Sequence, residues 1–131
     1  MQDKLTLQQR VTDLDLQAKC SNDARLWFNR SWNREDTNLL DYQNHYNKSL
    51  NKCFALVQFN WSSGKTGNIL DKSISVHDVY ENVERGHGGV TAILRNSEYK
   101  PTPNCQLDGE EKTFKEFQEC FNLLWSSFME K

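Results

Sequence analysis

Apolar positions in the first quarter of the chain recur at the spacing of an amphipathic helix. These positions are Leu16, Cys20, Ala24, Trp27 and Phe28. They fall on one face of a helix, because they stand at positions i, i+4, i+8, i+11 and i+12. The spacing predicts a helix over about residues 12–30, with this face buried. Residues 1–11 are polar and lack a capping residue, so we expect them to fray.

The next segment supports two interpretations. Tyr42, Tyr46, Leu50 and Cys53 have helical spacing, but residues 42–47 also alternate, and the intervening stretch is rich in turn-forming Asn. The second interpretation is a hairpin, with strands at 42–47 and 52–61. We favour the hairpin, because its second half carries the longest apolar run of the chain, Cys53–Val57, rich in strand formers.

Alternation of apolar and polar residues predicts a third strand at 73–83 and a fourth at 90–94. Between them, the run Arg85-Gly-His-Gly-Gly89 is typical of a glycine turn. Residues 97–105 contain both prolines of the chain and are expected to form a loop.

The C-terminal segment has the clearest helical pattern. Thr113 and Glu116 have the spacing of a capping box. An aromatic stripe follows at Phe114, Phe117, Phe121, Leu124 and Phe128. The pattern predicts a helix over 113–129 whose stripe belongs to the core. The predicted fold is therefore α+β: a single domain over 1–131, with an antiparallel sheet of about four strands and the two terminal helices packed on one of its faces.

Composition excludes several classes of function. The net charge is −2 and no run of four Lys or Arg occurs, so we expect no nucleic-acid partner. No stretch approaches 18 apolar residues, so no membrane span is expected. The start, Met1-Gln2-Asp3-Lys4, lacks the apolar core of a signal peptide. The chain is then either cytosolic or the mature form of an exported protein with an added Met.

The cysteines bear on that choice. Four stand at positions 20, 53, 105 and 120, and none form a C-x-x-C motif. An even count without metal-ligand spacing favours disulfides, for which three connectivities exist. We prefer Cys20–Cys53 with Cys105–Cys120. The alternative is four reduced, buried thiols in a cytosolic domain.

Candidate chemistry is sparse. Neither G-x-S-x-G nor H-E-x-x-H occurs, so no catalytic residue and no cofactor is predicted. One alternative is a cytosolic metal protein, with zinc held by His45, His77, His87 and a cysteine. Another is a small hydrolase with Cys53 or Cys120 as nucleophile beside a histidine, which would need a reduced and accessible thiol.

The block His45-Tyr-Asn-Lys-Ser-Leu-Asn-Lys-Cys-Phe54 resembles a signature of small exported bacterial proteins of uncharacterised function, HYN-x-K-L-x-K-C-F. Such proteins also carry an upstream cysteine, a DVYE-like stretch and a C-terminal helix, whose counterparts here are Cys20, residues 78–81 and residues 114–129. The chain departs from the signature at Ser49, where a Lys is expected. The resemblance implies export and a Cys20–Cys53 bridge, and implies no reaction.

These observations together predict a periplasmic or secreted, disulfide-stabilised binding module whose partner is a protein or small ligand of the cell envelope. Its binding residues would be His45, Tyr46 and Asn47, which offer an aromatic ring and two hydrogen-bonding groups. The competing interpretation is structural: Tyr46 belongs to the core, and His45 and Asn47 shape the turn.

Overall fold

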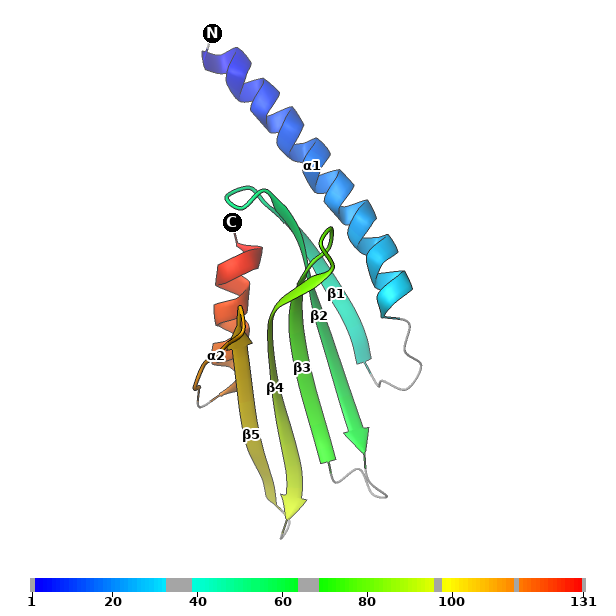
Figure 1. Ribbon diagram of the computed structural model, residues 1–131, viewed down its shortest axis with the longest axis vertical. Helices are drawn as coiled ribbons and strands as arrows, with labels where there is room; N and C mark the ends of the chain where they lie inside the picture. The colour runs from blue at the N-terminus through cyan, green and yellow to red at the C-terminus, as the bar shows by residue number, and fades with distance from the viewer. Residues whose placement is uncertain (1, 33–38, 64–68, 96–97, 115, 131) are drawn as a thin grey trace.

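In the computed structural model, one long helix leads into a six-stranded antiparallel sheet, and a short helical segment ends the chain (Figure 1). Residues 2–32, 39–63, 69–95, 98–114 and 116–130 are described, with side chains for 11–32, 41–60, 71–91, 104–114 and 116–130. Helix α1 spans Gln2–Ser31. The sequence predicted a helix from about residue 12, after a frayed segment. The helix instead begins at Gln2.

The sheet is a meander in which each strand pairs with the next along the chain. Its strands are β1 (Leu39–Asn47), β2 (Lys52–Ser63), β3 (Ile69–Asp78), β4 (Val83–Arg95), β5 (Glu98–Leu107) and β6 (Glu110–Glu111). The favoured hairpin is present as β1 and β2, in which Tyr46 pairs with Cys53. The predicted α+β class with an antiparallel sheet is confirmed, but the sheet has six strands rather than about four.

The two helices pack on opposite faces of the sheet, not on one face as predicted. Strand β2 explains the difference, because its residues 53–57 are all buried. Cys53, Ala55 and Val57 face α1 and pack with Cys20, Ala24 and Trp27. Phe54 and Leu56 face the other way and pack with Cys120, Leu124 and Phe128. A strand that is apolar on both sides needs a cover on each face.

The predicted glycine turn at Arg85–Gly89 is wrong, since these residues lie inside β4. The glycines serve close packing instead of a turn. A Cβ added at Gly88 would lie 2.3 Å from Cys120 Sγ, and one at Gly86 would lie 2.5 Å from Leu124 Cδ2. Only glycine lets the C-terminal helix approach β4 this closely.

The predicted loop at 97–105 is also wrong, because most of it forms β5. Its prolines are tolerated because, among the described strands, β5 has β4 on one side and just the two-residue strand β6 on the other. On the outer side of β5, the carbonyl of Cys105 accepts a hydrogen bond from Lys112 N at 2.8 Å. Pro101 and Pro103 have the same parity along the strand as Cys105. Their backbone nitrogens therefore face away from β4, and the missing N–H groups cost no hydrogen bond to that strand.

The C-terminal helix begins later than predicted. Helix α2 spans Phe117–Leu124 and continues as the π-helical turn η1, Trp125–Met129. Glu116, with extended backbone, is the N-cap and makes no side-chain cap, so the predicted capping box from Thr113 does not form. The pairing of β6 with β5 keeps the chain extended beyond residue 111, which delays the helix.

Two disulfides connect the helices to the sheet. Cys20–Cys53 joins α1 to β2 with a Cα–Cα distance of 5.4 Å, and Cys105–Cys120 joins β5 to α2 at 5.8 Å. This is the connectivity preferred from the sequence. Trp27 adds a polar contact on the α1 side, because its Nε1 donates to Asn82 Oδ1 at 2.8 Å. Within the described ranges, no helix combines the length and apolar character needed to cross a membrane.

Candidate functional site

A pocket of about 450 Å³ lies on the α1 side of the sheet, over β3 and β4. We call it the polar pocket; its lining includes Trp32, Phe59, Ser73, His77, His87 and Thr91. Among the described residues, helix α1 packs chiefly against β1 and β2, and its Trp27 reaches the ring of His77 on β3 at the border of the pocket. The volume is within the range typical of small-molecule sites.

The alternation of residues along β3 creates the pocket. Ile74 and Val76 point toward α2 and belong to its core. Ser73, Ser75 and His77 have the opposite parity, and they pair with Phe59, Val57 and Ala55 of β2. Opposite residues in an antiparallel pair point to the same face, so the α1-side face changes from apolar on β2 to polar on β3.

His77 is a partly buried titratable group of the pocket. Its Nε2 lies 2.8 Å from the Oγ of Ser75, which is 6% exposed. The imidazole lies 5.0 Å from the ring of Trp27 and meets Trp32 edge-on at 5.5 Å. Burial lowers the pKa of His77 from 6.5 to about 4, because the charged form loses its hydration. The ring is therefore neutral near pH 7 and offers one donor and one acceptor.

Carboxylates stand at both ends of the pocket, and each is already engaged. Asp71 accepts a hydrogen bond from the Thr91 hydroxyl. Glu84 lies 3.0 Å from His87 Nδ1. Between them, Gly89 presents bare backbone: a Cβ there would lie 3.1 Å from Lys72 O and 3.4 Å from Ser73 Oγ. The pocket thus combines aromatic side chains, hydroxyls and a glycine whose position has no room for a side chain.

The residues predicted to bind, His45, Tyr46 and Asn47, lie at the end of β1 and do not line the polar pocket. Tyr46 is 8% exposed and its hydroxyl donates to Asn51 Oδ1. Asn47 is fully buried. Its Nδ2 donates to the Phe128 carbonyl at 3.0 Å, and its Oδ1 accepts from Leu50 N at 3.0 Å.

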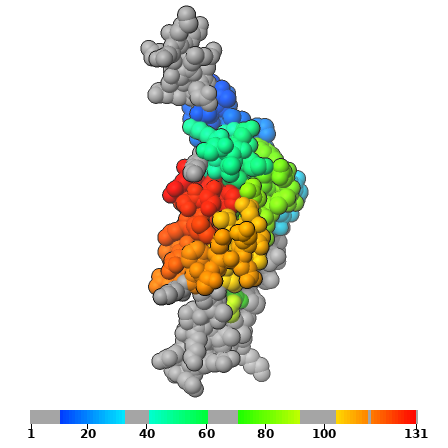
Figure 2. All heavy atoms as spheres, turned by 60° about the vertical axis from the view of Figure 1, so that its left-hand side comes forward, coloured from blue at the N-terminus to red at the C-terminus, as the bar shows by residue number. Residues whose placement is uncertain are grey.

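Asn47 therefore connects the β1–β2 turn to the C-terminal segment. The two lie against each other in the space-filling view, where the C-terminal segment is red and the hairpin is green-cyan (Figure 2). This placement supports the structural interpretation of Asn47. A binding role for the three residues stays a prediction.

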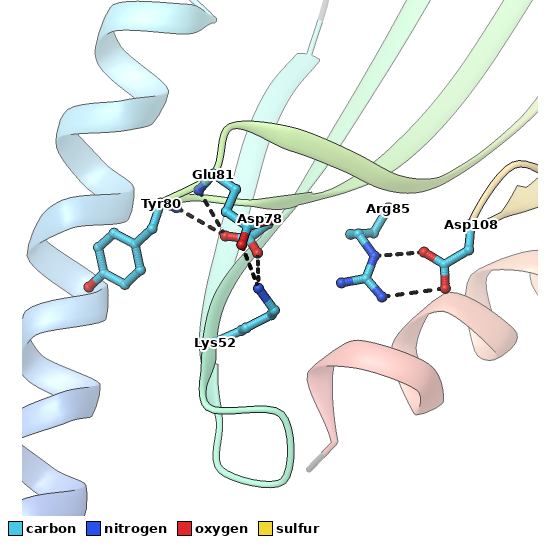
Figure 3. Close-up of polar contacts among 6 residues, drawn as sticks. All are labelled: Lys52, Asp78, Tyr80, Glu81, Arg85 and Asp108. Atoms are coloured by element: carbon cyan, nitrogen blue, oxygen red, sulfur yellow. Dashed lines mark hydrogen bonds and ion pairs between the residues drawn. The ribbon is translucent and has the colours of Figure 1, made fainter.

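A charged cluster at the β3–β4 turn has a structural explanation (Figure 3). Lys52 Nζ lies 2.9 Å from Asp78 Oδ2 and 3.1 Å from Glu81 Oε1. The other oxygen of Asp78 accepts from the backbone N–H groups of Tyr80 and Glu81, both at 3.1 Å, which is the geometry of a side chain that closes a turn. The hydrogen bond with Asp78 raises the pKa of Lys52.

Arg85 points away from that cluster toward Asp108 (Figure 3). Its Nε lies 2.6 Å from Asp108 Oδ1, and this hydrogen bond raises the arginine pKa further above its ordinary value. The guanidinium also lies 5.2 Å from the ring of Phe128, within range of a cation–π contact. These charged groups thus satisfy one another and stabilise the turn, and none of them points into the polar pocket.

The described residues do not support a zinc site or a nucleophilic cysteine. All four cysteines are in disulfides, so neither Cys53 nor Cys120 is a thiol. Among the described residues, no group of three His, Cys, Asp or Glu side chains is placed to hold a metal ion. His45 lies on β1, whereas His77 and His87 line the polar pocket from neighbouring strands.

The pocket residues were missed at the sequence level, although a signal was present. Residues 73–77 alternate Ser, Ile, Ser, Val, His, so one parity of a predicted strand is polar. Such a strand is typical of a sheet with one solvated face. The second half of the site was hidden, because Gly88 and Gly89 were interpreted as a turn.

Comparison with known proteins adds no family assignment. No protein-family model, no curated protein and no solved structure matches the chain.

Proposed function

We propose that the chain is an exported, disulfide-stabilised binding module that takes a small ligand in the polar pocket. The observation that carries the proposal is the pocket itself: a hollow of about 450 Å³ over β3 and β4 in which aromatic rings, hydroxyls and a histidine lie together. Binding sites combine a mostly preformed hollow with a few fixed polar groups. Ser75 and His77, held by the sheet and by two tryptophan rings, are groups of that kind.

Export is supported by the two disulfides. Such bonds persist in oxidising compartments and are rare in the reducing cytosol. Both join a helix to the sheet, so each stabilises the tertiary fold. The resemblance of residues 45–54 to a signature of exported bacterial proteins points the same way.

The binding test uses amide NMR of the oxidised protein against a mixed set of small soluble compounds: saccharides, amines, carboxylates and short peptides. We expect at least one compound to shift resonances of β3 and β4 around Ser73, His77 and Thr91, and to leave α2 unchanged. Shifts confined to other surfaces, or no shift with any compound, would overturn the proposed function.

Export is tested separately by counting alkylatable thiols, using intact mass, in protein recovered from its native cells. Oxidised, exported protein has none before reduction and four after reduction. Four free thiols before reduction would contradict export.

A further inference from the structure

We propose that the ligand of the polar pocket is a neutral saccharide, bound with a ring face on Trp32 and its hydroxyls on β3 and β4. This inference rests on the proposed function and names the ligand class for the same site. A sugar ring has apolar C–H faces and a polar hydroxyl edge. Its site therefore needs an aromatic surface next to a set of mixed donors and acceptors.

The aromatic surface is formed by Trp32 and Phe59. Both side chains are partly exposed at the pocket, and their ring centroids are 6.0 Å apart with a tilt of 44°. The edge-on contact between Trp32 and His77 limits how the indole can rotate. Large, rigid rings supply contact area with little loss of conformational entropy.

The polar groups suit hydroxyls. Ser73 and Thr91 carry hydroxyls that both donate and accept, and Asn104 carries an amide with both capacities. Ser73 pairs with Gly89, and Gly89 pairs with Asn104, so these groups form a row across three strands. Gly89 lies in the middle of the row, where a Cβ would lie 3.1 Å from Lys72 O and 3.4 Å from Ser73 Oγ, so any side chain at this position would crowd the pocket floor.

The charge of the pocket argues against an anionic ligand. Asp71 and Glu84 line its two ends, whereas no arginine is among the lining residues described. Lys72 lines the pocket, but it has the opposite parity on β3 and contributes its backbone carbonyl at the pocket floor. An anion would therefore meet carboxylates without a compensating cation.

An organic cation is the closest competitor, because aromatic rings and carboxylates also favour one. Both carboxylates are engaged, Asp71 by Thr91 and Glu84 by His87, so neither is a free counter-charge. A neutral ligand does not need to break either contact, and the Asp71–Thr91 pair still has lone pairs for a sugar hydroxyl.

The test titrates the oxidised protein with neutral mono- and disaccharides at millimolar concentrations and follows the amide and indole NMR signals. We expect at least one sugar to shift Trp32, Gly89 and Thr91. Trp32→Ala should weaken that binding by at least about tenfold, which corresponds to about 1.4 kcal/mol. Trp125→Ala is the matched control, because Trp125 is partly buried against Phe121 on the α2 side of the sheet.

A second variant guards against misfolding of Trp32→Ala. Ser73→Ala removes one hydroxyl of the row and leaves the Asp71–Thr91 contact in place, so it should weaken sugar binding while the NMR dispersion stays native. Binding of amines or peptides at these resonances, without any sugar, would overturn the saccharide inference and leave the proposed function standing. If no compound class shifts the resonances of the pocket residues, both the saccharide inference and the proposed function are overturned.

Discussion

At the residue scale, the strongest constraint on sequence comes from the glycines of β4. The Cβ that any other residue would place at position 88 falls 2.3 Å from Cys120 Sγ, inside a disulfide that cannot move freely. We predict that Gly88→Ala lowers the free energy of unfolding by about 1–3 kcal/mol, because it overpacks the interface between β4 and α2. Urea unfolding of the oxidised variant measures the loss.

The clash can be isolated by a double-mutant cycle. Replacing both Cys105 and Cys120 by alanine removes the Sγ atom that the new methyl group would meet. In that background, Gly88→Ala should cost less than in the native chain, with a coupling energy of at least about 0.5 kcal/mol. Equal costs in the two backgrounds would show that another contact explains the glycine.

Asn47 distinguishes a folding role from a binding role. Asn47→Ala leaves the Phe128 carbonyl and the Leu50 N–H without the partners they have now. Because the site is fully buried, we expect a loss of about 2–4 kcal/mol in the free energy of unfolding. Ser49→Ala, exposed in the same turn, is the control and should change stability by less than about 0.5 kcal/mol. A fully stable Asn47→Ala protein would contradict the structural role.

His77 gives stability a defined pH dependence. Burial lowers its folded-state pKa to about 4 from the ordinary 6.5, so between these values the unfolded chain binds more protons than the folded one. The contribution of neutral His77 is fully present above about pH 6.5 and is lost as the pH falls toward 4, by at most about 3 kcal/mol.

The measurement is urea unfolding of the native chain and of His77→Gln at about pH 7, 5.5 and 4.5. The difference between the two proteins should shrink on acidification, since glutamine does not titrate. His87→Gln is the control, because His87 is 40% exposed. A difference that is constant across this range would contradict a depressed pKa at position 77.

At the element scale, the sequence predicted the elements whose spacing is regular, and missed those shaped by long-range contacts. The face containing Leu16, Cys20 and Trp27 predicted α1, and the run at 53–57 supported the hairpin. Strand β4 was predicted only over 90–94, and β5 was interpreted as a loop, because their glycines and prolines oppose a strand locally. Contacts elsewhere in the chain explain these glycines and prolines. Cys120 approaches Gly88 closely, and β5 lies near the edge of the sheet.

The two disulfides should each protect the helix they hold. Replacing Cys20 and Cys53 by alanine should speed amide hydrogen exchange in the second half of α1 more than in α2, because only α1 loses its covalent link. Replacing Cys105 and Cys120 should do the reverse. Each pair is the control for the other, and equal acceleration of both helices by either change would contradict separate attachment.

At the scale of the whole molecule, one sheet separates two hydrophobic cores. The proposed binding site depends on where helix α1 stops covering its face of the sheet. The apolar faces of both helices were predicted, but neither their placement on opposite sides of the sheet nor the extent of α1 over it was. That extent follows from the Cys20–Cys53 bond and the Trp27–Asn82 hydrogen bond. The polar pocket is the remainder of that face, so it emerges only from the assembled chain.

Removing both disulfides tests how far this assembly depends on an oxidising compartment. The chain-entropy model assigns about 3 kcal/mol to the shorter loop and slightly more to the longer one, or about 6–7 kcal/mol together. That is a large share of the roughly 5–15 kcal/mol by which domains are stable. We therefore predict that full reduction moves the urea midpoint strongly downward. The chain with alanine at all four cysteine positions is the control, because reductant should leave it unchanged. A native chain with the same midpoint before and after complete reduction would remove the physical argument for export.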